Sequence, residues 1–140
     1  MDGRVNVRVV TRSRVDGTEE TLRFAGEGVL RRRPGGWLLH YEAVCETDGT
    51  ATESSVRLTD EPVHIALRSG ACLLHLDPAG QTQARLLEGE QDSTPMTVTT
   101  REASWQLDGP DEGRVTMHYL LSLGGAPVSD LHVSLYLTKR

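Results

Sequence analysis

The chain has 140 residues, of which 37% are hydrophobic and only 4% aromatic, and it carries a net charge of −5 at pH 7. This length fits one domain, residues 1–140, whose core can form without disulfides or a metal. The acidic balance argues against general nucleic-acid binding, and no apolar run reaches the ~18–20 residues of a membrane helix.

Hydrophobic and polar residues alternate along most of the chain, and turn dipeptides separate the alternating stretches, as in antiparallel sheets. The first stretch includes 5–9, where valines occupy every second position. The Asp-Gly dipeptide at 16–17 favours a two-residue turn, because both residues tolerate a positive φ. This turn places Val9 opposite Phe24, so the apolar residues of the first hairpin share one face.

Two further hairpins extend the same apolar face. A Pro-Gly turn at 34–35 pairs Leu30 with Leu39. An Asp-Gly turn at 48–49 then pairs Leu39 with Leu58. In both hairpins the apolar residues of neighbouring strands coincide, which is the condition that a correct register must satisfy.

The rest of the chain continues the hairpin pattern with less regular spacing. A Ser-Gly turn at 69–70 pairs Ile65 with Leu74 and sets His64 directly opposite His75. The remaining elements are expected in this order: a short strand at 84–87, a polar loop at 88–95, a hairpin of 96–100 with 103–107, and a closing hairpin of 115–123 with 128–138.

These elements predict an all-β domain of eight to ten strands in antiparallel up-and-down order. A flat meander of that width would leave two long edges exposed to aggregation. Native twist curls such a sheet, and closure removes its edges. We therefore predict a small closed β-barrel, with a two-sheet sandwich as the alternative architecture.

Four stretches of the chain form a recognisable pattern: "DGTEETLRFAGEGVLRRRPGGWLLHYE" at 16–42, Arg-x-Gly at 68–70, Pro-Met-Thr-Val at 95–98 and the later strand that contains Tyr119. In these stretches the chain resembles the YwiB-like family of uncharacterised bacterial proteins. This resemblance implies a calycin-like, or lipocalin-like, β-barrel, and it implies no activity. The sequence departs from the family at 88–94, where family members often carry a Tyr-Thr-Pro-Tyr-Gly-like segment, so a family ligand need not carry over.

Five aromatic side chains are predicted to point into the barrel. A barrel of about eight strands is either filled by its side chains or holds one small ligand. The leading hypothesis is a non-catalytic barrel that binds a small apolar molecule, and the alternative is a packed core. The candidate ligand-binding residues are Phe24, Trp37, Tyr41, Trp105 and Tyr119.

Arginines alternate with the valines of the first hairpin and are predicted to point away from the core. Residues 1–33 carry a net charge of +3 and residues 34–140 carry −8. Arg8, Arg12 and Arg23 are therefore candidate contacts for an anionic partner, either RNA or an acidic protein. The alternative is a solvated barrel exterior, because the sequence pattern places no aromatic residues between these arginines for base stacking.

The histidines of two predicted hairpins face each other: His64 opposes His75, and His118 lies near His132. Opposed residues have Cβ atoms about 5 Å apart, so two imidazoles could share a metal ion. A strong site needs three or four ligands, however, and the pattern predicts no carboxylate or cysteine beside either pair. We predict no metal and no other cofactor, and interpret both pairs as solvated.

No residues with a catalytic role can be named from the sequence. Cys45 and Cys72 fall in the apolar register, where a thiol is normally a small inert hydrophobe. Neither a Gly-x-Ser-x-Gly nucleophile motif nor a glycine-rich phosphate loop occurs. The first residues lack the apolar stretch of a signal peptide, so we expect a soluble cytoplasmic protein with reduced cysteines.

Overall fold

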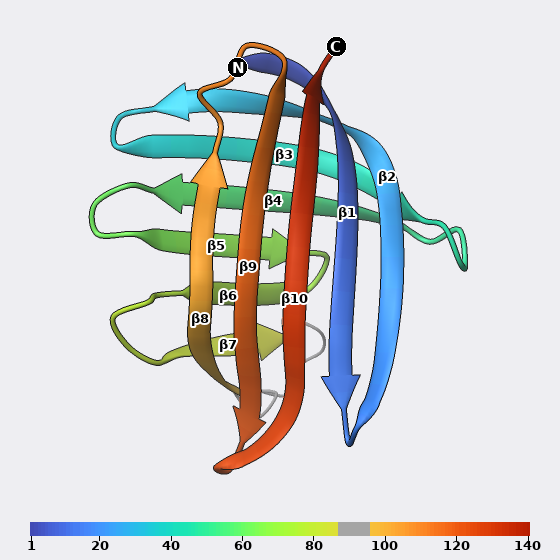
Figure 1. The fold of residues 1–140 in the computed structure, drawn as a ribbon, viewed down its shortest axis with the longest axis vertical. Helices are drawn as coiled ribbons and strands as arrows, with labels where there is room; N and C mark the ends of the chain where they lie inside the picture. The colour runs from blue at the N-terminus through green and yellow to red at the C-terminus, as the bar shows by residue number, and fades with distance from the viewer. Residues whose placement is uncertain (87–95) are drawn as a thin grey trace.

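The protein forms a closed antiparallel barrel of ten strands in a computed structural model that describes residues 1–86 and 96–140 (Figure 1). Each strand pairs with its neighbours in sequence, and β1 also pairs with β10, which closes the ring. The predicted up-and-down barrel is therefore confirmed, and the sandwich alternative is wrong. The strands are β1 Gly3–Val15, β2 Thr18–Arg33, β3 Gly36–Cys45, β4 Ala51–Thr59, β5 His64–Ser69, β6 Cys72–Leu76, β7 Thr82–Leu86, β8 Met96–Gln106, β9 Glu112–Leu123 and β10 Ala126–Lys139.

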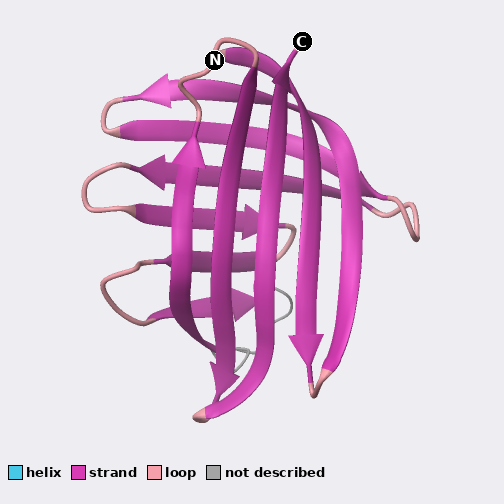
Figure 2. Cartoon of the chain, viewed as in Figure 1, coloured by secondary structure: helices cyan, strands magenta, loops and turns pink. Residues whose placement is uncertain are grey.

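Every regular element in the described part of the chain is a strand (Figure 2). Over those same residues, no helix is long and apolar enough to cross a membrane.

The barrel is flattened into two layers that β2 connects. Strands β8, β9, β10 and β1 run side by side, while β3 to β7 cross behind them at a steep angle, and β2 curves from one layer into the other (Figure 1). Glycines allow this close packing of β2 on β3. A Cβ atom on Gly26 would collide with the carbonyl oxygen of Glu42, and one on Gly28 with that of His40.

The inward faces of the ten strands meet in one hydrophobic core. Leu39 is 1% exposed and Ile65 is fully buried, while Phe24 is partly buried and packs against the same core. These residues carry the shared apolar face that the sequence predicted. Most of the core side chains are Val and Leu, which is expected for a chain with few aromatic residues.

The first two hairpins have the predicted register. Val9 lies opposite Phe24 across the turn at 16–17, and Leu30 lies opposite Leu39 across the turn at 34–35. Both turns contain two residues, and both place glycine at a positive φ, as such tight turns require.

The third and fourth hairpins are each displaced by two residues from the prediction. Leu39 opposes Val56 instead of Leu58, because the loop contains four residues, 46–49, rather than two. Ile65 opposes Leu76 instead of Leu74, because the two-residue turn is 70–71 rather than 69–70. The inward faces survive both displacements, since a shift of two residues keeps each side chain on its own side of the sheet.

The predicted hairpin of 96–100 with 103–107 is also wrong. Residues 96–106 form the single strand β8, which is interrupted by a register shift between Thr100 and Glu102. The polar pair at 101–102 lies at a bulge and does not form a turn. Residues 84–86 of the predicted strand at 84–87 lie in β7, whereas residue 87 and the predicted loop at 88–95 lie outside the described residues.

Candidate functional site

A cavity of about 260 Å³ lies inside the barrel, between its two layers. One side of the cavity is mostly apolar and comes from β1, β2, β9 and β10, with Thr11 and Tyr119 as its polar residues. The alternation of side chains along each strand directs these residues inward, while their neighbours face solvent. The apolar wall consists of Val9, Phe24, Met117, Val133 and Leu135.

The opposite side of the cavity carries a row of polar groups. Tyr41 pairs with Ser54, Ser54 with Ser69, and Ser69 with Cys72, so consecutive register pairs carry the row across β3, β4, β5 and β6. The Ser54 hydroxyl donates a hydrogen bond to the Ser69 hydroxyl over 3.0 Å. This row gives an otherwise apolar cavity a few groups that can form hydrogen bonds with a ligand.

The interior of the cavity is a low-dielectric environment. Burial raises the pKa of the Tyr119 phenol well above its ordinary value. Burial likewise raises the pKa of Tyr41, and a hydrogen bond with Ser54 partly offsets that shift. The pKa of the Cys72 thiol is raised by the same cause. All three groups are therefore neutral near pH 7, and none of the described lining residues carries a charged side chain.

The cavity approaches solvent at one end of the barrel. Among its lining residues, Ala43, Met117 and Tyr119 are buried, whereas Phe24 and Ser69 are partly exposed. Ser69 immediately precedes the β5–β6 turn, so the exposed part lies toward the end of the barrel that holds this turn.

Three of the five predicted interior aromatics meet at this cavity, namely Phe24, Tyr41 and Tyr119. Trp37 and Trp105 belong to the barrel but do not line the cavity. Trp37 is 6% exposed and has the Arg32 guanidinium 4.9 Å from its ring centre. Trp105 is partly buried and packs against the core near the end of β8. The two tryptophans therefore belong to the core rather than to the cavity wall.

The model of a domain of unknown function, DUF1934, matches residues 7–135. The chain belongs to this family. Its fold is also that of the YwiB protein from Bacillus subtilis, whose crystal structure matches with a TM-score of 0.79 over 99% of this chain and 93% of that one. The two sequences are 15% identical, so this likeness shows the fold alone. The predicted YwiB-like resemblance is confirmed. A search of the curated proteins finds no match.

The outer face of the DUF1934 barrel holds the predicted arginines. Arg8, Arg12 and Arg23 are all exposed on β1 and β2. The ion pairs in this region use other arginines: Arg14 pairs with Glu19, Arg31 with Asp2, and Arg140 with Glu27.

The sequence reasoning missed an aromatic residue on this face. Tyr136 is 40% exposed and lies directly opposite Arg8 across the β1–β10 pair. The Arg114 guanidinium lies 5.2 Å from the centre of the tyrosine ring. The signal was present in the sequence, because Tyr136 falls between the inward positions Leu135 and Leu137 and must therefore face out.

Both predicted histidine pairs are close in space. His118 and His132 are direct partners across β9 and β10. The prediction that His64 directly opposes His75 is wrong, because the displaced register sets His75 opposite Ala66. The rings of His64 and His75 are nevertheless neighbours, with centroids 5.3 Å apart and planes tilted by 32°.

Proposed function

We propose that this DUF1934 barrel is a non-catalytic binding protein for a small, uncharged, mostly apolar molecule. The observation that carries this proposal is the interior cavity of about 260 Å³, which combines an apolar wall with one row of hydroxyl groups. Ligand sites in proteins commonly have this composition, in which apolar contacts supply affinity and a few polar groups fix orientation.

The chemistry of the cavity restricts its ligand. A charged group would lose its hydration without gaining an opposite charge from the described lining residues, which costs several kcal/mol or more. A dry cavity of about 150 Å³ already admits benzene, so this larger cavity can hold a ligand of one or two rings. The Ser54–Ser69 pair suits a single hydroxyl or carbonyl group on that ligand.

The protonation states in the cavity favour binding over catalysis. A catalytic cysteine needs a lowered pKa, because the thiolate is the nucleophile. Burial shifts the pKa of Cys72 in the opposite direction. The phenols of Tyr41 and Tyr119 are also shifted away from the range in which a general base operates.

The proposal is tested by thermal denaturation and calorimetry with two matched probes, neutral 4-methylphenol and anionic 4-methylbenzoate. The neutral probe should raise the melting temperature in proportion to the logarithm of its concentration, and the anion should not. Ala43, which lines the cavity, can be replaced by leucine to fill it, and Ala25→Leu is the matched exposed control. Ala43→Leu should weaken binding of the neutral probe, because it removes part of the cavity, and Ala25→Leu should preserve it. Equal binding of both probes, or of both variants, would contradict the proposal.

A second candidate function is contact with single-stranded RNA through the outer face of β1, β2, β9 and β10. The exposed ring of Tyr136 between Arg8 and Arg114 favours it, because an exposed aromatic beside cations can stack on a base. Changing Arg8, Arg12 and Arg23 together to serine should remove a salt-dependent affinity for oligouridine.

The matched control for that test changes three exposed arginines of other strands to serine and so alters the net charge equally. These are Arg57, Arg68 and Arg85. An equal loss of affinity in both triple variants would show that the net charge alone causes the effect, and it would reject an RNA site on this face.

A further inference from the structure

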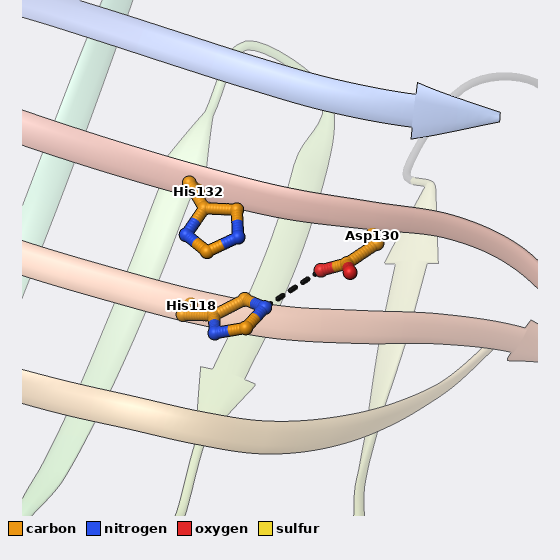
Figure 3. A group of neighbouring side chains, drawn as sticks. All are labelled: His118, Asp130 and His132. Carbon is orange, nitrogen blue, oxygen red and sulfur yellow. Dashed lines mark hydrogen bonds and ion pairs between the residues drawn. The ribbon is translucent and has the colours of Figure 1, made fainter. Parts of the chain in front are cut away.

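A cluster of two imidazoles and one carboxylate lies on the outside of the barrel. The rings of His118 and His132 stack, with centroids 3.7 Å apart and planes inclined by 20°. Asp130 precedes His132 by two residues and so projects from the same face of β10. Its Oδ1 atom accepts a hydrogen bond from Nε2 of His118 over 2.7 Å (Figure 3).

The three side chains are arranged so that one ion could reach them all. One ligand atom from each residue lies within 4.8 Å of the other two. Two ligands of a tetrahedral zinc ion are about 3.3 Å apart, given zinc–nitrogen and zinc–oxygen bonds of roughly 2.0–2.1 Å. Small side-chain rotations would therefore suffice. In Figure 3 Asp130 and both rings lie on the same side of the β9–β10 hairpin.

We propose that His118, Asp130 and His132 form a binding site for a divalent transition metal such as Zn²⁺. Two imidazoles and a carboxylate are the ligand set of several three-ligand metal sites, which leave coordination positions open for water or substrate. Binding displaces the Nε2 proton of His118 to solvent, and the metal takes its place between the imidazole and the carboxylate.

Irregularities in two strands lie beside this cluster. β10 has a register shift between Pro127 and Ser129, immediately before Asp130. β8 has a shift between Thr100 and Glu102, and Glu102 is the residue opposite His118. Bulges re-aim side chains and are frequent beside functional sites. One shift lies in the pairing of β9 with β10 and the other in the pairing of β9 with β8, so β9 has an irregular neighbour on each side near the cluster.

Basic residues of β1 lie next to the site and should limit its affinity. Arg12 is the register partner of His132, and Arg14 is that of Asp130. Arg14 is held by an ion pair with Glu19 at 3.4 Å, whereas Arg12 is exposed on the same face as His132. A metal ion would therefore meet repulsion chiefly from Arg12, so Arg12→Ser should bind the metal more tightly than the unaltered chain.

The test is calorimetric titration of the full chain with Zn²⁺, together with thermal denaturation before and after addition of a chelator. One equivalent of zinc should bind and raise the melting temperature, and the chelator should reverse that rise. His118→Ala, His132→Ala and Asp130→Asn should each weaken binding by at least about tenfold, the loss typical of even an outer ligand partner. Asp130→Asn is nearly isosteric, and His132 is exposed, so these two variants should keep the fold.

The control is His75→Ala, which removes one histidine from the His64–His75 pair. This variant should bind zinc as the unaltered chain does. Absence of zinc binding by the unaltered chain would overturn the proposal. Loss of binding in His75→Ala with retention in His132→Ala would also overturn it, as would an unchanged affinity in Arg12→Ser.

Discussion

Replacing Ala43 by leucine should stabilise the protein because the larger side chain fills part of the interior cavity. Ala43 is 2% exposed, and its side chain lines the cavity from β3. The substitution adds three carbon atoms that would project into space that protein atoms do not occupy. In an ordinary packed core the same change would force neighbouring side chains out of their preferred rotamers.

The size of the effect follows from the area removed from water. Three methylene equivalents at about 0.8 kcal/mol each give a gain of about 2.4 kcal/mol. Immobilising a leucine side chain costs about 0.5–1 kcal/mol, so the free energy of unfolding should rise by about 1–2 kcal/mol. For a chain of 140 residues this corresponds to an increase of about 3–8 °C in the melting temperature.

The assay is urea denaturation followed by circular dichroism, with thermal melts as a second measurement. Ala25→Leu on the exposed face of β2 is the control and should change the free energy of unfolding by less than about 0.5 kcal/mol. A loss of about 1–3 kcal/mol in Ala43→Leu would be the cost of overpacking, and it would refute the reasoning that space is free beside this residue.

Three further predictions concern the polar row, the buried phenols and the glycine contact. Ser54→Ala should lower the free energy of unfolding by about 1–3 kcal/mol in urea denaturation, because it leaves the hydroxyls of Ser69 and Tyr41 without this partner. Tyr41 and Tyr119 have raised pKa values in the folded protein, so above about pH 10 the unfolded chain loses these phenol protons first. The contribution of the two phenols to the free energy of unfolding is therefore complete below about pH 10 and decreases as the pH rises above it. Denaturation midpoints measured between neutral and strongly alkaline pH should show that fall, and a flat profile would contradict the burial of both phenols. Gly28→Ala should destabilise the barrel by about 1–3 kcal/mol or more in the same assay, because its Cβ atom would meet the backbone of β3, and a neutral effect would show that the two strands are farther apart.

The barrel could be predicted from the sequence because the register of each hairpin was checked by asking whether the apolar residues of both strands lie on the same face. Apolar residues coincided across every early hairpin, and the closed sheet with Leu39 and Ile65 inside follows from that coincidence. The same test cannot detect a slip of two residues, because side chains alternate with a period of two. This is why the partners of Leu39 and Ile65 were displaced in the third and fourth hairpins.

Turn lengths are the information that the pattern lacked. The Asp-Gly dipeptide at 48–49 belongs to a four-residue loop, in which the Asp48 carboxylate accepts a hydrogen bond from the Thr50 backbone N–H over 2.8 Å. The dipeptide at 16–17 is also Asp-Gly, and it forms a true two-residue turn. A side-chain hydrogen bond of this kind can stabilise either loop, so composition alone did not separate them.

The candidate sites were predictable only in part. The sequence pattern shows which side chains point into the barrel, but it does not show how far along the barrel axis each one lies. Tyr41 and Trp37 were therefore equivalent candidates, although only Tyr41 lines the cavity. The sequence analysis predicted no metal at the His118–His132 pair, because it placed no carboxylate beside that pair. His118 and His132 were expected to be neighbours, and Asp130 lies two residues before His132 on the same face. Applying the strand period to that carboxylate would have supplied the third ligand.

The most direct test of the ligand cavity is a crystal structure of the unaltered chain under xenon pressure. Xenon enters apolar cavities of about 150 Å³ or more without requiring specific contacts. A xenon atom should bind between Phe24, Met117 and Leu135, against the apolar wall. A barrel interior filled by its own side chains, with no xenon at that position, would contradict the account.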